Sequence, residues 1–161
     1  MISMMMSAEQ QARERAAVTR CAAEWIDTPF HSHATIKGTD GGVDCAMLPA
    51  CVFKEALGVE FSIPEYLFQW HLHADPVTGK FRQLLIDTLL KNGFVEVPES
   101  ELGPGDIVTG RMGEVYAHCA IIVDWPFVIH ASDRRGVKRI RWHMRNQMRI
   151  FSWGPWHESI V

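Results

Sequence analysis

The chain has 161 residues, of which 47% are hydrophobic and 22% charged, and its formal net charge is −3. This length and balance are typical of one globular domain and exclude a disordered, collagen-like or coiled-coil chain. No apolar run approaches the roughly 18 residues of a membrane span, and the N-terminus lacks the features of a secretory signal. We therefore expect a single domain over residues 1–161, with residues 1–7 as a short extension and synthesis in the cytoplasm.

Helical periodicity dominates the first half of the sequence. A helix starting near Ala8 is ended by Thr28-Pro29, and Asp44 is placed to cap a second helix that Gly58 closes. A turn-rich stretch over residues 37–42 separates the two. The predicted helices are Ala8–Ile26, Cys45–Leu57, Pro64–His73 and Lys80–Lys91.

After Gly93 the hydrophobic pattern alternates as in strands. The predicted strands are Phe94–Val97, Asp106–Thr109, Val115–Asp124, Phe127–Ala131, Val137–Trp142 and Met148–Trp153. Short connections between the later strands favour antiparallel pairing. Helices followed by strands predict an α+β fold, in which N-terminal helices pack on a central antiparallel sheet.

One of the four cysteines lies where a thiol becomes reactive. Cys45 follows Asp44 at a predicted helix start, where the helix dipole and free backbone N–H groups favour the thiolate. Cys21 and Cys51 lie in apolar-periodic stretches and are predicted to be core residues. Without a C-x-x-C motif or a signal peptide, a disulfide framework is not expected.

A cysteine nucleophile needs a base, and two histidines interrupt successive apolar strands. If Val123 pairs with Phe127, His118 and His130 become diagonal neighbours on one face of the sheet. This register requires a three-residue loop over residues 124–126 or an equivalent bulge, because a regular two-residue loop would place the histidines on opposite faces. On this register Cys119 points away from the face of His118 and is predicted to be structural.

Five ordered motifs resemble those of the NlpC/P60 cell-wall cysteine peptidases, and most closely the branch found in bacteriophage tail gene clusters and gene-transfer agents. The motifs span most of the chain. They are Trp25-Ile26-Asp27-Thr28-Pro29-Phe30, Gly42-Val43-Asp44-Cys45-Ala46-Met47-Leu48, Gly103-Pro104-Gly105-Asp106-Ile107-Val108, His118-Cys119-Ala120-Ile121 and Ile129-His130-Ala131.

The resemblance implies a papain-like α+β fold with Cys45 as nucleophile, His118 as base and His130 as the orienting third residue. It also implies an oxyanion site at the helix start, formed by Asp44 and the Cys45 amide. Phe30, where many members have tyrosine, is expected beside the substrate, with His31 as a replacement for the missing hydroxyl. No metal or other cofactor is implied.

The implied substrate is the stem peptide of peptidoglycan, typically cut between D-glutamate and diaminopimelate. The implied setting is the virion tail tip, among other tail-tip proteins and without nucleic acid or a membrane span.

Three other interpretations remain open at this point. The chain could be a tail-tip assembly protein with weak or no activity, docking through Trp125, Trp142, Trp153, Trp156 and the basic stretch 134–149, although Trp142 and Trp153 suit core packing better. Zinc could bind the pairs His31/His33 and His71/His73, but neither pair has a completing ligand. The basic stretch could bind nucleic acid, although no binding motif accompanies it; an anionic cell-wall substrate suits it equally.

Overall fold

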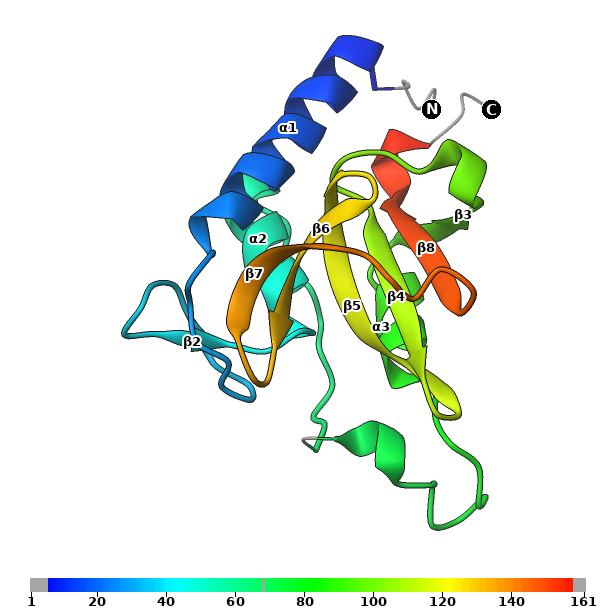
Figure 1. Ribbon diagram of the computed structural model, residues 1–161. Helices are drawn as coiled ribbons and strands as arrows, with labels where there is room; N and C mark the ends of the chain where they lie inside the picture. Colours follow the sequence, from blue (N-terminus) through cyan, green and yellow to red (C-terminus); the bar gives the residue numbers. More distant parts are fainter. Residues whose placement is uncertain (1–5, 68, 158–161) are drawn as a thin grey trace.

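The computed structural model describes residues 6–67 and 69–157 (Figure 1). Within them, three α-helices pack against a six-stranded antiparallel sheet, which confirms the predicted α+β class. The helices are α1 (Ala8–Glu24), α2 (Met47–Leu57) and α3 (Leu84–Lys91). None of these described helices is long and apolar enough to cross a bilayer. Residues 1–5 of the predicted N-terminal extension lie outside the described residues.

The sheet has the order β3-β8-β4-β5-β6-β7, with every neighbouring pair antiparallel. Its strands are β3 (Phe94–Val97), β4 (Ile107–Met112), β5 (Val115–Asp124), β6 (Phe127–Ser132), β7 (Gly136–Arg141) and β8 (Met148–Trp153). All six correspond to predicted strands, within three residues at each end. A small additional sheet pairs β1 (Thr35–Ile36) with β2 (Gly42–Val43) inside the stretch predicted only as turns.

The helix predicted over Pro64–His73 is wrong. Only Trp70–Leu72 forms a turn of 3-10 helix there, and Phe68 lies outside the described residues. Gln69, immediately before that turn, has a left-handed backbone with φ of 58°, which an α-helix cannot include. The following helix starts at Leu84 instead of Lys80. Apart from the 3-10 turn, the described residues 59–67 and 69–83 between α2 and α3 form no helix or strand.

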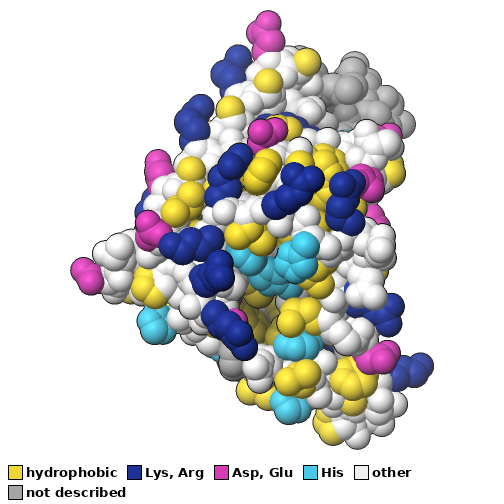
Figure 2. Space-filling model, in the orientation of Figure 1, with side chains coloured by type: hydrophobic (Ala, Val, Ile, Leu, Met, Phe, Trp, Pro, Cys, Tyr) yellow, Lys and Arg dark blue, Asp and Glu magenta, His cyan; other side chains and the backbone are white. Residues whose placement is uncertain are grey.

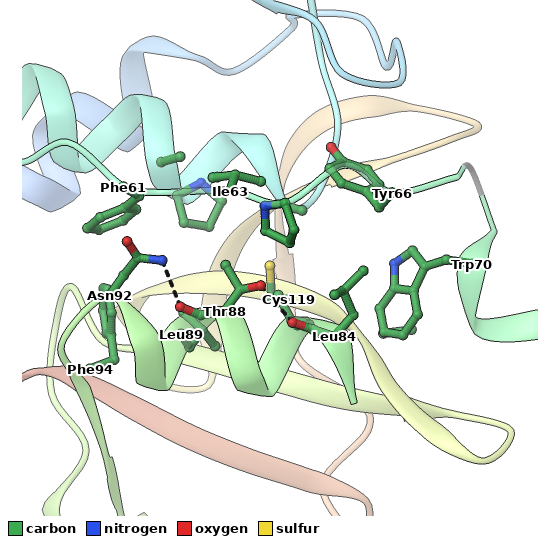
Figure 3. Close-up of a pocket in the computed structure, with 16 residues that line it drawn as sticks. Phe61, Ile63, Tyr66, Trp70, Leu84, Thr88, Leu89, Asn92, Phe94 and Cys119 are labelled. Carbon is green, nitrogen blue, oxygen red and sulfur yellow. Dashed lines mark hydrogen bonds between the residues drawn. The ribbon is translucent and has the colours of Figure 1, made fainter. Parts of the chain in front are cut away.

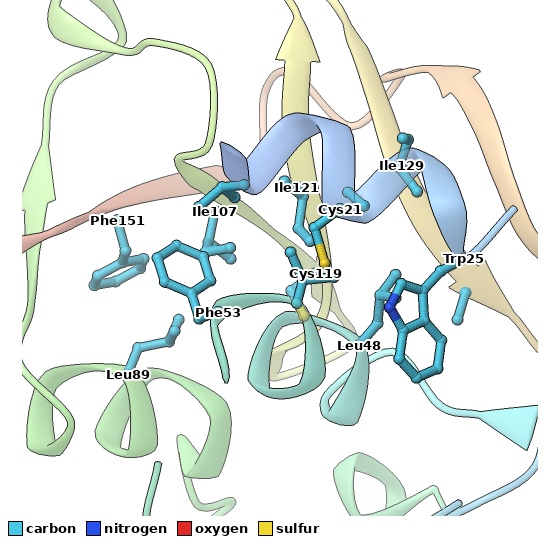
Figure 4. Close-up of a cluster of buried hydrophobic side chains, with 14 of the residues drawn as sticks. Cys21, Trp25, Leu48, Phe53, Leu89, Ile107, Cys119, Ile121, Ile129 and Phe151 are labelled. Atoms are coloured by element: carbon cyan, nitrogen blue, oxygen red, sulfur yellow. The ribbon is translucent and has the colours of Figure 1, made fainter. Parts of the chain in front are cut away.

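The main hydrophobic core lies between the helices and one face of the sheet (Figure 4). Trp25, which directly follows α1, and Phe53 of α2 are almost fully buried in the same cluster as sheet residues such as Ile121 and Phe151. Ser7 caps the start of α1, and Gly58, with a left-handed φ of 71°, ends α2 as predicted. The core thereby fixes α2, and the residues that precede it, against β5.

A smaller cluster covers the opposite face of the sheet, around Val108, Ile122, Val128 and Trp142. Trp142 is only 2% exposed and Trp156 only 5%, so the docking surface of exposed tryptophans considered from the sequence does not form. Trp153 packs against the main core and Trp125 against the smaller cluster. All four tryptophans belong to or pack against a hydrophobic cluster, as predicted for Trp142 and Trp153.

A buried ion pair ties α1 to the start of β4. The Arg15 guanidinium donates to the Asp106 carboxylate at 2.8 Å, and the Asp106 side chain is fully buried. The same carboxylate accepts hydrogen bonds from the Gly103 amide at 2.8 Å and from the Ser152 hydroxyl at 2.5 Å. Asp106 is thus the shared acceptor of this cluster, while the Arg15 guanidinium also donates to the Gln11 side chain and to the Pro104 carbonyl.

We predict that Asp106→Ala lowers the free energy of unfolding by about 3–5 kcal/mol, because the partly buried Arg15 charge would lose its carboxylate partner and the Gly103 amide and Ser152 hydroxyl a buried acceptor. Urea denaturation measures the change. Lys54→Ala, which breaks the exposed pair with Glu60, serves as the control and should shift stability by less than about 1 kcal/mol. Equal effects of the two substitutions would contradict a structural role for the buried pair.

Candidate active site

Asp44 organises the turn that leads into α2. Its carboxylate is 3% exposed and accepts four hydrogen bonds. One oxygen accepts from the amides of Ala46 (3.0 Å) and Met47 (2.8 Å), as a helix-capping residue does. The other accepts from the His33 amide (2.7 Å) and the Tyr66 hydroxyl (2.5 Å). Asp44 thus joins the helix start to two segments that are distant in the sequence.

Cys45 lies between this cap and strand β5. The first regular residue of α2 is Met47, two residues later than predicted, because Asp44 holds residues 45 and 46 in a turn. The Cys45 thiol contacts the Ala117 carbonyl at 3.9 Å, one residue before His118. Since Asp44 occupies the amides of Ala46 and Met47, the Cys45 amide is left without an acceptor among the described residues.

His118 and His130 face each other across neighbouring strands, with His118 Nε2 and His130 Nδ1 separated by 2.7 Å. The pairs Ile121–Ile129 and Ile122–Val128 set the register, and a bulge at Val123 lets Asp124 pair with Phe127. The sequence predicted either a three-residue loop or such a bulge as the condition for placing both histidines on one face of the sheet. The Trp142 ring lies parallel to His118, with centroids 6.1 Å apart.

These side chains open into a cleft of about 480 Å³. The pairing of β5 with β6 ends at Ile121–Ile129, and the two strands diverge beyond this pair (Figure 1). Figure 2 shows histidine side chains beside a hollow with apolar walls, flanked by lysine and arginine side chains. The cleft is lined by Phe30, Ser32, Asp44, Cys45, Tyr66, Trp70, His118, His130, Ser132 and His143, among others.

The environment of Cys45 favours its thiolate. The neighbouring Cys119 thiol is the largest cause that lowers the pKa of Cys45 to about 5. Burial opposes this effect, and the hydrogen bond and charge of His118 add to it. Burial, followed by the charges of His118 and His143, lowers the pKa of His130 to about 4. His130 is therefore neutral at pH 7 and can accept a hydrogen bond from His118.

The structure brings together Asp44, Cys45, His118, His130 and Phe30, but not His31. Phe30 lines the cleft and its backbone bridges to Val43. The exposed His31 lies outside the cleft lining, and its ring packs close to Gly42. The hydroxyl that reaches this region belongs to Tyr66, which the sequence did not identify because segment 59–83 carries no readable motif.

One group of potential metal ligands occurs among the described residues, formed by Cys21, Glu24 and Glu55. The Lys37 ammonium already pairs with both carboxylates, at 3.0 Å to Glu24 and 2.6 Å to Glu55. The histidine pairs considered as zinc ligands do not belong to this group. His33 instead contacts the Tyr66 carbonyl through Nε2 at 2.6 Å.

A second, smaller cavity of about 50 Å³ lies next to the cleft (Figure 3). The residues Ala46, Tyr66, Trp70 and Ala117 line both spaces. Figure 3 shows Cys119 on the wall of this cavity, among apolar side chains of α3 and of segment 59–83. The side chain of Cys119 therefore lies on the helix side of β5, away from the face of His118, as predicted.

Comparison with known proteins identifies the class. The profile of the NlpC/P60 family matches residues 29–154. This span includes most of the chain and, apart from residues 25–28, all five sequence motifs. The protein therefore belongs to the NlpC/P60 family, a family of cysteine peptidases. A comparison with curated protein sequences found no match.

Solved structures confirm the papain-like NlpC/P60 fold. The NlpC/P60 domain of the peptidoglycan hydrolase SagA aligns with a TM-score of 0.58 and 19% identity, over 86% of this chain and 97% of that one. The peptidoglycan hydrolase RipB from Mycobacterium tuberculosis aligns with a TM-score of 0.59 and 16% identity, over 92% and 68%. Of a longer Staphylococcus aureus NLP/P60 protein, the chain covers 41%. At these identities the likeness concerns the fold alone.

The pKa of Cys45 gives a direct prediction. Alkylation of Cys45 by iodoacetamide should rise through a midpoint near pH 5 and level off above about pH 6, because the thiolate is the reactive form. Cys51, whose pKa burial raises to about 11, should stay unreactive over this range. Peptide mass spectrometry separates the two sites. A Cys45 midpoint near 8.5, the value of an ordinary thiol, would contradict the arrangement.

Proposed function

We propose that this protein is a cysteine endopeptidase that hydrolyses the stem peptides of peptidoglycan. The observation that carries the proposal is the grouping of Cys45, as a thiolate, with the hydrogen-bonded pair His118–His130 in an open cleft. A nucleophile, a base and a group that orients the base are the parts that covalent acyl transfer requires. Membership of the NlpC/P60 family supports the same reaction.

The proposed reaction begins when the Cys45 sulfur attacks the amide carbonyl carbon and the C=O electron pair moves to oxygen. The Cys45 amide, left unoccupied by the Asp44 cap, donates to this oxyanion. His118 then donates a proton to the leaving amine, and the C–N bond breaks to leave a thioester on Cys45. Finally His118 removes a proton from water, whose oxygen attacks the thioester and releases the acid and the thiolate.

His130 acts in this scheme through His118. Because neutral His130 accepts at Nδ1 from the Nε2–H of His118, the Nδ1 atom of His118 is the one assigned to face Cys45. The Trp142 ring lies parallel to the His118 ring, with the two centroids 6.1 Å apart. The pair thus fixes both the tautomer and the direction of the base.

The charge around the cleft supports an anionic substrate. Ser132 and Asp133, at the turn between β6 and β7, line the cleft, and the next two residues are the exposed Arg134 and Arg135. Neither arginine has an ion-pair partner among the described residues, whereas Arg145 pairs with Glu99 and Arg149 with Glu96. Stem peptides carry free carboxylates, and we propose the D-glutamyl–diaminopimelate linkage as the bond that is cut.

We further propose that the protein works as part of a bacteriophage tail, at its tip and among other tail proteins. The support is the resemblance of the five motifs to the tail-associated branch of the family. Mass spectrometry and antibody labelling of purified virions would test this location. Absence of the protein from virions would refute the tail assignment without affecting the peptidase proposal.

We predict that Cys45→Ala abolishes cleavage of purified muropeptides and that His118→Ala lowers kcat/KM by about 10²- to 10⁴-fold. His130→Asn should retain more activity than His130→Ala, because an amide oxygen can still accept from His118. Mass spectrometry of the fragments measures turnover, and the exposed His73→Ala is the matched control. Undiminished cleavage by Cys45→Ala would refute the nucleophile. Intact muropeptides with the wild type would favour the assembly role.

We predict that Arg134→Gln/Arg135→Gln raises KM for stem peptides several-fold in low salt and much less near 1 M salt, where charges are screened beyond about 3 Å. The control is Arg13→Gln/Arg20→Gln, which removes the same charge from exposed positions on α1. Steady-state cleavage at both salt concentrations provides the comparison. Equal KM values for the two double variants would contradict a role for this turn in substrate binding.

A further inference from the structure

The start of α2 contains a main-chain acceptor without its helical donor. In an α-helix each carbonyl accepts from the N–H four residues later. Leu48 donates in this way to the Asp44 carbonyl at 3.0 Å. The corresponding donor for the Cys45 carbonyl would be residue 49, which is proline and has no N–H. The residue that carries the nucleophile therefore needs another partner for its carbonyl.

Cys119 supplies that partner. Its thiol lies 2.9 Å from the Cys45 carbonyl oxygen and is positioned to donate to it. Cys119 is 1% exposed, and its strand neighbour His118 points to the opposite face of β5. One strand thus sends consecutive side chains to Cys45 from two directions, the imidazole from the cleft and the thiol from the core.

The protonation of the two thiols suits this arrangement. The hydrogen bond with Cys45, together with burial, raises the pKa of Cys119 well above its ordinary value, so Cys119 keeps its proton at neutral pH. The adjacent Cys119 thiol is also the largest cause that lowers the pKa of Cys45, while its one proton is directed to the Cys45 carbonyl oxygen. Cys119 therefore remains a donor to the Cys45 main-chain carbonyl throughout the neutral range.

We propose that Cys119 is a positioning residue, whose thiol replaces the N–H missing at Pro49 and so holds the Cys45 peptide, and with it the Cys45 sulfur, in place beside His118. The part of this inference that concerns catalysis rests on the proposed function. The part that concerns the position of the Cys45 sulfur does not, because it is measured by the chemistry of Cys45 alone. Cys119 is not itself proposed to touch the substrate.

The remaining cysteines provide a contrast. Cys21 donates to Glu55 at 3.4 Å, and the pKa of Cys21 is raised to about 12, chiefly by burial. Cys51 lies on α2 itself, half-buried, four residues after Met47. Neither thiol makes a described hydrogen bond with Cys45. Cys51→Ser is thus a matched control for thiol loss close to the site.

The test is the pH profile of iodoacetamide alkylation at Cys45, followed by peptide mass spectrometry, with circular dichroism to verify folding. Cys119→Val removes the donor at similar volume, and we expect it to raise the midpoint by about one to two pH units. Cys119→Ser retains a donor and should stay close to wild type, as should Cys51→Ser. Adding Pro49→Ala to Cys119→Val restores an N–H for the Cys45 carbonyl and should recover part of the shift.

An unchanged midpoint in Cys119→Val would overturn the proposal, and so would an equal shift in Cys119→Ser and Cys119→Val. If the Cys119→Val protein does not fold, Cys119→Ala takes its place with the same expectations. A wild-type midpoint near 5 combined with intact muropeptides would refute the peptidase function while leaving this inference standing. Normal muropeptide cleavage by the wild type, together with an unchanged alkylation profile in Cys119→Val, would refute the role of Cys119 and leave the peptidase function standing.

Discussion

The candidate site depends on the register between β5 and β6. The two strands pair as Ile121–Ile129 and Ile122–Val128, and the bulge at Val123 preserves this pairing through the two-residue turn that follows Asp124. A shift by one residue would turn one histidine to the opposite face, because side chains alternate along a strand. With this register the two imidazole nitrogens lie 2.7 Å apart, and both histidines line the cleft that also contains Cys45.

The second requirement is a helix start that holds a sulfur at that opening. Asp44 joins the turn before α2 to the segments of His33 and Tyr66, and its buried carboxylate has all four of its partners within the protein. The Asp44 carboxylate binds the amides of Ala46 and Met47, so the Cys45 amide is left without an acceptor among the described residues. Pro49 and Cys119 then determine how the Cys45 carbonyl is satisfied. Cys45 is therefore held by the Asp44 turn that precedes it, by the His118–Cys119 pair of β5 and by the core packing of α2.

The sequence predicted the parts of the structure that local pattern determines. The bounds of β3 and β5 and the closure of α2 at Gly58 follow from alternation and from glycine geometry, and the approach of His118 to His130 follows from strand register. Segment 59–83 could not be predicted, because its conformation depends on the left-handed Gln69 and on contacts of Tyr66 with Asp44. Cys119 was correctly assigned to the core side, but only the three-dimensional arrangement relates it to Cys45.

The central claim is that the Cys45 sulfur forms a covalent bond with the carbonyl carbon of a wall peptide. The most direct test is to quench a reaction of the protein with purified muropeptides in acid within milliseconds to seconds, and to determine the mass of the peptide that contains Cys45. We expect a transient thioester on Cys45 that decays as product forms. Product formation without any adduct on Cys45, at a rate that Cys45→Ala reproduces, would contradict this claim.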